Sequence, residues 1–90
     1  MTEELKANIL LVDDEEQFLN VFSQRLKSRG LKIETAVSGE EAISRSRGKD
    51  IDAIVLDLAM PGMGGLETLK QLRAENPDLQ VIILTGHASL

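Results

Sequence analysis

The chain has 90 residues, of which 42% are hydrophobic and 28% charged, so it has a globular composition and intrinsic disorder is excluded. This length allows one domain, and we assign residues 1–90 to it. The formal net charge of −5 argues against nucleic-acid binding, because phosphate contacts need clustered Lys and Arg. The chain has no cysteine, no secretory leader pattern and no apolar run near the ~20 residues of a membrane span. We therefore expect a cytoplasmic protein without membrane attachment.

Apolar strands and amphipathic helices alternate from the start of the chain. An apolar run at residues 9–12 predicts a buried strand. Apolar positions spaced by three and four residues predict a helix over 15–29, and Gly30 ends it. Alternating apolar and polar residues over 31–36 predict a strand at the edge of a sheet, with one face more exposed to solvent than the other.

The second half of the chain continues this alternation. A capping-box pattern at residues 38–41 predicts a helix that starts near Gly39 and ends before Gly48. The remaining expected elements are a buried strand at 51–56, a helix at 65–75 and a buried strand at 81–85.

The expected order is therefore β-α-β-α-β-α-β. Strands separated by helices cannot pair as hairpins and need right-handed crossovers, which implies a parallel sheet with helices on both faces. This arrangement is the doubly wound α/β class. There is no internal repeat and no interdomain linker, and residues 61–65 form a single tight loop.

Three aspartates follow two of the buried strands. Asp13 and Asp14 come directly after the first expected strand, and Asp57 comes after the third. Open α/β sheets place their sites at this edge, so the carboxylates converge if these strands are neighbours, about 4.8 Å apart. An oxygen-only site suits Mg²⁺, and a carboxylate beside Mg²⁺ can attack a phosphoryl group, which gives Asp57 a second use. Thr85, at the end of the last expected strand, can hydrogen-bond a phosphoryl oxygen there.

Ordinary structural roles are the alternative for each of these residues. Asp14 can cap the first helix, Asp13 can be solvated, and Asp57 can accept hydrogen bonds from the glycine-rich loop. The glycines of the 61–65 loop match neither a Walker A nor a dinucleotide motif, so we interpret them as turn residues. His87 has no His or Cys partner for a transition metal, so we expect an exposed loop residue.

Three segments resemble one known family. They are residues 9–15 (ILLVDDE), 54–65 (IVLDLAMPGMGG) and 81–87 (VIILTGH). Together they resemble the receiver domain of two-component response regulators, and the resemblance covers essentially the whole chain. It implies a flavodoxin-like fold, a phosphorelay signalling function, and a histidine kinase or phosphotransfer protein as partner.

The resemblance also implies a role for each site residue. Asp57 accepts the phosphoryl group. Asp14 and Asp57 ligate Mg²⁺ directly, together with the backbone carbonyl of Ala59, while Asp13 acts mainly through water. Thr85 matches the switch hydroxyl that turns toward the phosphoryl group. Such a domain catalyses its own phosphorylation and dephosphorylation, and is not an enzyme with an external product.

Two departures from the family pattern matter. Many members carry Asp where this chain has Gly64, and we expect this to alter loop geometry more than chemistry. Family receivers also continue with a further helix, strand and helix, and carry a lysine after that strand, whereas this sequence stops at Leu90. We therefore expect an incomplete receiver whose fourth strand is an uncovered apolar edge, through which copies self-associate.

Two other functions remain alternatives. A non-catalytic, self-associating fragment or engineered scaffold derived from a receiver is the first, and its association would be indifferent to Asp57→Asn. A phosphatase with an aspartyl nucleophile is the second. It needs an acid two residues after Asp57, where this chain has Ala59.

Overall fold

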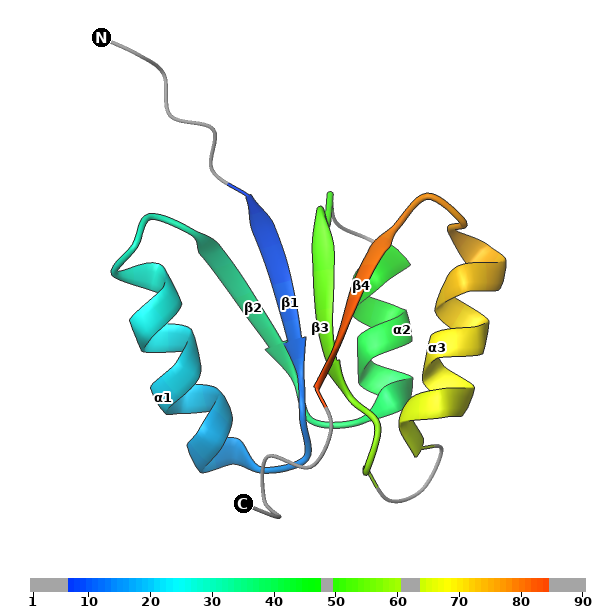
Figure 1. The fold of residues 1–90 in the computed structure, drawn as a ribbon, viewed down its shortest axis with the longest axis horizontal. Helices are drawn as coiled ribbons and strands as arrows, with labels where there is room; N and C mark the ends of the chain where they lie inside the picture. The colour runs from blue at the N-terminus through cyan, green and yellow to red at the C-terminus, as the bar shows by residue number, and fades with distance from the viewer. Residues whose placement is uncertain (1–6, 48–49, 61–63, 85–90) are drawn as a thin grey trace, which may run out of the picture.

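Strands and helices alternate in the computed structural model, which describes residues 7–47, 50–60 and 64–84 (Figure 1). The elements are β1 (Asn8–Val12), α1 (Glu16–Lys27), β2 (Lys32–Ala36), α2 (Gly39–Arg47), β3 (Ala53–Asp57), α3 (Gly64–Glu75) and β4 (Gln80–Leu84). The expected order of elements is confirmed. None of the helices in these ranges is long and apolar enough to pass through a membrane.

The four strands form one parallel sheet in the order β2-β1-β3-β4. The expected edge position of β2 is confirmed, and β1 and β3 are neighbours, which is the condition for the aspartates to converge. These are the first four strands of the flavodoxin-like order 2-1-3-4-5. The described residues hold no fifth strand.

Helices cover both faces of the sheet. The connection from β1 to β2 runs in one direction and those from β2 to β3 and from β3 to β4 run in the other. Right-handed crossovers therefore place α1 on one face and α2 and α3 on the opposite face (Figure 1). The main core lies on the α2/α3 face, and its buried strand and helix residues are Leu10, Val12, Ala36, Ile54, Leu56, Ala42, Ile43 and Leu72.

The first helix is shorter at both ends than the sequence predicted. It begins at Glu16 and ends at Lys27. The backbone N–H of Arg29 bonds to the carbonyl of Leu26, three residues back, so the chain tightens into a turn before it leaves the helix. Gly30 then takes a positive φ of 93°, a conformation that glycine adopts without strain.

The start of α2 has the predicted capping box with one difference. The hydroxyl of Ser38 accepts a hydrogen bond from the Glu41 backbone N–H at 3.1 Å. The Glu41 carboxylate reaches back to the N–H of Val37, at 2.9 Å, one residue earlier than the usual pattern. The bond from Val37 lowers the pKa of Glu41, and the neighbouring Arg45 lowers it further.

β4 forms the second edge of the sheet, next to β3. Its residues from Val81 to Leu84 are all apolar, and the side chains of Ile82 and Ile83 are 52% and 36% exposed. Within the part of the chain that the structure describes, no strand pairs with the outer side of β4. Among the described residues β4 is therefore an apolar edge strand, and the prediction of a buried strand is wrong for Ile82 and Ile83.

Candidate metal site

The carboxylates of Asp13, Asp14 and Asp57 converge at the carboxyl edge of the sheet. Asp13 directly follows β1, and Asp57 is the last residue of β3 rather than the first residue after it. The two strands pair in parallel, with Val12 beside Leu56. One oxygen from each carboxylate lies within 4.8 Å of the other two. The convergence expected from the sequence is therefore present.

Backbone hydrogen bonds hold the two buried aspartates of this cluster. Asp13 is 1% exposed; its N–H donates to the carbonyl of Ala36 at 3.1 Å, and its Oδ1 accepts from the N–H of Glu15 at 2.9 Å. Asp57 is 4% exposed, and its Oδ1 accepts from the N–H of Ala59 at 3.0 Å. These bonds fix the carboxylates and offset part of the free energy needed to bury charge.

Two of the ordinary roles considered for these residues are wrong. Asp13 is buried, not solvated. The N-cap of α1 is Glu15, without a side-chain capping bond, so Asp14 does not cap the helix. Asp14 is instead exposed at the mouth of the cluster. The third role is present in part, because Asp57 does accept a loop N–H, that of Ala59.

Gly65 brings the start of α3 against the backbone that carries Asp57. Its N–H donates to the carbonyl of Leu58 at 3.3 Å. A Cβ at this position would lie 2.5 Å from the carbonyl oxygen of Asp57 and closer still to the Cα of Leu58. Only glycine fits here. Gly64, with a φ of 79°, and Gly65 open the helix, so for these two the turn-residue interpretation is wrong.

Other residues singled out in the sequence are placed as follows. Ala59 is exposed two residues beyond Asp57. Thr85 and His87 lie outside the described residues, as do residues 61–63 of the glycine-rich loop. The Gly65 contact was missed by sequence reasoning, because the motif alone does not reveal which backbone lies against the glycine.

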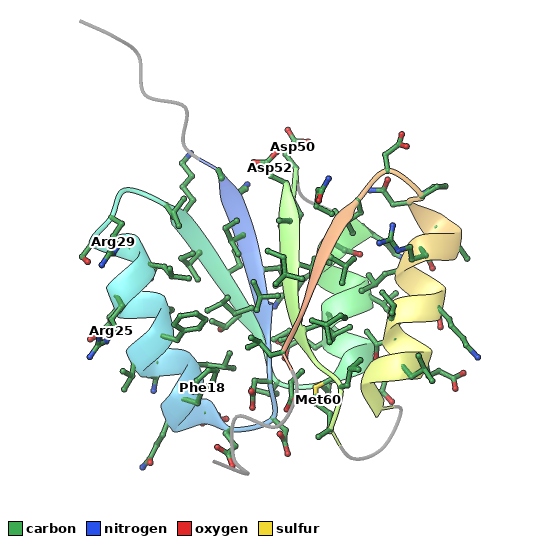
Figure 2. All side chains as sticks on the ribbon, in the orientation of Figure 1. Phe18, Arg25, Arg29, Asp50, Asp52 and Met60 are labelled. Carbon is green, nitrogen blue, oxygen red and sulfur yellow. The ribbon has the colours of Figure 1, made fainter. Side chains whose placement is uncertain are left out.

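The acidic residues at the amino ends of the central strands form no part of the cluster. Asp50 and Asp52 lie at the end of the sheet opposite the cluster (Figure 2). Asp52 Oδ2 accepts the backbone N–H of Asn8 at 2.8 Å, and Asn8 Nδ2 donates to the carbonyl of Asp50 at 2.8 Å. These contacts join the start of β1 to the chain just before β3.

The donor set of the cluster fits a hard divalent cation. It offers three carboxylate oxygens within reach of one ion and no nitrogen or sulfur ligand. Two of the three charges, those of Asp13 and Asp14, lie just before α1, whose N-terminal dipole favours anions. That dipole cannot balance three carboxylates, whereas a divalent cation at this position would supply the missing positive charge.

The profile of the family described as Response regulator receiver domain matches residues 9–90. The chain belongs to this family. Among curated relatives of this receiver domain is the probable transcriptional regulatory protein TcrX of Mycobacterium tuberculosis, 43% identical over 80 residues. The match covers 89% of the receiver chain but 34% of TcrX, so the chain spans about a third of that relative's length.

Solved structures share the fold of the receiver. TrrA of Thermotoga maritima in complex with Mg²⁺-BeF is 35% identical with a TM-score of 0.85, over 92% of this chain and 72% of TrrA. The complex of histidine kinase ThkA with TrrA gives 36% identity and a TM-score of 0.84, over 90% and 70%. A response regulator from Burkholderia pseudomallei with a phosphorylated aspartic acid and a calcium ion is 28% identical with a TM-score of 0.83. That match covers 91% of this chain and 48% of the other.

Proposed function

We propose that this receiver domain is an Mg²⁺-dependent phosphoacceptor of a two-component system. The carrying observation is the buried Asp57, held beside Asp13 and Asp14 at the carboxyl edge of the sheet. Structural neighbours that bind Mg²⁺-BeF, carry a phosphorylated aspartate or form a complex with a histidine kinase support this proposal. The domain acts in the cytoplasm and modifies only itself.

In this proposal Asp57 is the nucleophile. One of its carboxylate oxygens bonds to phosphorus while the P–N bond of a phosphohistidine breaks, and the electron pair of that bond returns to the imidazole. Asp13, Asp14, Asp57 and the carbonyl of Ala59 hold Mg²⁺, Asp13 mainly through water. When bound, the ion neutralises the carboxylates and the incoming phosphoryl oxygens. Thr85 donates its hydroxyl to a phosphoryl oxygen.

The N–H of Ala59 keeps the Asp57 side chain in place for this step. It holds Oδ1 at 3.0 Å through a two-residue turn. Because Gly65 packs against the same stretch of backbone, the carboxylate is positioned from both sides of residues 57–59. Such positioning favours in-line attack without a large reorganisation of the acid.

Phosphoramidate, which has the P–N bond of a phosphohistidine, is the probe that tests this function without the partner kinase. Intact-mass spectrometry of the chain with phosphoramidate and Mg²⁺ should show the gain of one phosphoryl group. Asp57→Asn should abolish the gain, and a chelator should suppress it in the unchanged chain. Asp50 is an exposed acid at the opposite end of the strands, so Asp50→Asn is the matched control and should react normally. Mg²⁺-independent labelling, or labelling of Asp57→Asn, would contradict the proposal.

A second candidate is the non-catalytic, self-associating module, and the exposed apolar edge of β4 favours it. The two candidates differ in their response to phosphorylation. If association serves signalling, phosphorylation changes the sedimentation coefficient of the chain and Asp57→Asn removes that change. Association that stays the same under phosphorylation and in Asp57→Asn favours the scaffold.

A further inference from the structure

Thr68 is a polar residue on the buried face of α3. It shares that face with Gly65, three residues before it, and Leu72, four residues after it, and all three are buried. Thr68 is 0% exposed, so its hydroxyl is cut off from water and needs a hydrogen-bond partner within the protein. That partner is the carbonyl of Gly64, to which the hydroxyl donates at 2.6 Å. The described residues alone therefore bury this hydroxyl and satisfy its donor.

The carbonyl that Thr68 holds belongs to the same peptide group as the N–H of Gly65. A peptide group is planar and rigid, so a bond to its oxygen also restricts the direction of its N–H. That N–H donates to the carbonyl of Leu58 at 3.3 Å. The restriction matters because Gly64, with a φ of 79°, has the wide conformational freedom of glycine. Thr68 therefore helps to fix how the start of α3 meets the backbone of Leu58.

The same relation recurs one step closer to the acidic cluster. The carbonyl of Leu58 and the N–H of Ala59 belong to one peptide group, and that N–H donates to Asp57 Oδ1 at 3.0 Å. Three hydrogen bonds and two peptide groups thus form a continuous chain from the Thr68 hydroxyl to the Asp57 carboxylate. Every donor in this chain points toward the carboxylate.

Hydrogen bonds that follow one another in this way strengthen one another. When the oxygen of a peptide group accepts a bond, the N–H of the same group becomes a better donor, by about 10–30% per bond. The low dielectric of a buried site enhances the effect. The last acceptor is a carboxylate, and bonds to charged acceptors are about twice as strong as bonds between neutral groups. Loss of the first hydroxyl therefore weakens both later bonds, including the one that holds the carboxylate.

We infer that Thr68 is a positioning residue for the phosphoacceptor, because its hydroxyl strengthens, through two peptide groups, the bond that fixes Asp57 Oδ1. This role rests on the phosphoacceptor function proposed above. Thr68 acts through the backbone and takes no part in the bond changes at phosphorus. The orientation of the Asp57 carboxylate governs both its contact with Mg²⁺ and its attack on phosphorus, so both should weaken without the hydroxyl.

Two comparisons isolate the hydroxyl of residue 68. Thr68→Val replaces it with a methyl group at nearly constant volume, whereas Thr68→Ser and Thr68→Ala both lose the methyl group and differ from each other by the hydroxyl alone. In each comparison, the chain without the hydroxyl should bind Mg²⁺ about two- to fivefold more weakly and react with phosphoramidate more slowly by a similar factor. This effect is smaller than the loss of about 10–100-fold that follows removal of a direct partner of a metal ligand.

Amide proton spectra read the chain of hydrogen bonds directly. Without the hydroxyl, the amide protons of Gly65 and Ala59 should move to lower chemical shift and exchange faster with solvent, because both take part in weakened bonds. Ser23→Ala is the matched control. It removes another buried helix hydroxyl, which donates to the carbonyl of Asn20 at 3.2 Å within α1. This variant should change neither the two amide signals nor the Mg²⁺ affinity.

The possible failures can be told apart. If the unchanged chain neither binds Mg²⁺ nor gains a phosphoryl group, the proposed function is wrong and the positioning role is lost with it. If the unchanged chain reacts, but Thr68→Val and Thr68→Ala lose only stability and keep the Mg²⁺ affinity, rate and amide shifts, Thr68 is a core residue and the inference is overturned. Circular dichroism verifies folding, and if Thr68→Val does not fold, the comparison of Thr68→Ser with Thr68→Ala decides.

Discussion

At the scale of single residues, the cluster depends as much on a missing side chain as on its carboxylates. Gly65 lets α3 begin against the backbone of Leu58, and Leu58 follows directly after Asp57. Gly64 serves a different need, since its positive φ of 79° is a conformational requirement and its Cβ position is open space. Adjacent glycines are therefore required for unrelated physical reasons.

Alanine substitutions separate these two requirements. Gly64→Ala should destabilise the fold by about 1–2 kcal/mol, the strain of a left-handed residue with a Cβ. Gly65→Ala should destabilise it by at least about 1–3 kcal/mol because the overlapping atoms are backbone, and should also displace Asp57. Urea unfolding followed by circular dichroism gives the stabilities. An Mg²⁺ titration should show weakened binding in Gly65→Ala alone, and equal Mg²⁺ affinity in both variants would contradict this account.

At the scale of elements, α2 packs Ala42 and Ile43 into the core and makes polar contacts at both of its ends. Ser38 and Glu41 cap its start. At its end, Arg47 donates two hydrogen bonds to Glu75 of α3, at 2.9 and 2.6 Å, and this contact lowers the pKa of Glu75. The Arg47–Glu75 pair is exposed, so salt screens it, whereas the capping bonds satisfy backbone groups that otherwise lack partners.

The pH dependence of stability should reveal the Glu41 cap. The folded state lowers the pKa of Glu41 below its ordinary value of 4.5, so the stabilisation is fully present above pH 4.5 and is lost as the pH falls through the lower folded value. Glu41→Gln should therefore be less stable than the unchanged chain at pH 7, and the difference should shrink below pH 4.5. Ser38→Ala, the control, should lose about 1 kcal/mol at both pH values. A Glu41→Gln deficit that persists unchanged at low pH would refute the assignment.

Much of this arrangement could be predicted from the sequence, since helix periodicity, capping residues and apolar runs are local signals. The convergence of Asp13 with Asp57 could also be predicted once β1 and β3 were taken as neighbours. The close contact at Gly65 could not be predicted, because it depends on the path that the backbone of residues 57–58 takes past the start of α3. No local sequence pattern indicates that path. The shift of the Glu41 bond to Val37 depends on a backbone direction just before the helix, which residue types alone do not determine.

At the scale of the whole molecule, three of the acids behind the net charge of −5 lie in one cluster. This concentration destabilises the folded state whenever no cation balances it. A cation that binds only the folded chain has the opposite effect. At a free cation concentration one hundred times its Kd, it raises the free energy of unfolding by about 2.7 kcal/mol. The cluster should therefore reverse its contribution to stability when Mg²⁺ binds.

Asp14→Asn should show this reversal in thermal unfolding. In a chelator, the variant should melt higher than the unchanged chain, because one repulsive charge worth about 1 kcal/mol or less is gone. In saturating Mg²⁺ the order should invert, because the variant loses a ligand and most of the Mg²⁺-dependent rise. Each 1 kcal/mol corresponds to about 4–8 °C in a domain of this size. Asp50→Asn removes the same charge outside the cluster and should show no inversion.

The position of β1 in the sheet also governs the order in which the chain can acquire its structure. β1 lies between β2 and β3, and the bond from the Asn8 N–H to Asp52 spans 44 residues. During synthesis, residues 8–12 leave the ribosome before residues 53–57 and keep one side unpaired until those residues emerge. Loop closure over that separation slows folding, and the apolar strand stays accessible to chaperones in the meantime. β1 is therefore made before β3 but can be enclosed on both sides only after β3 has emerged.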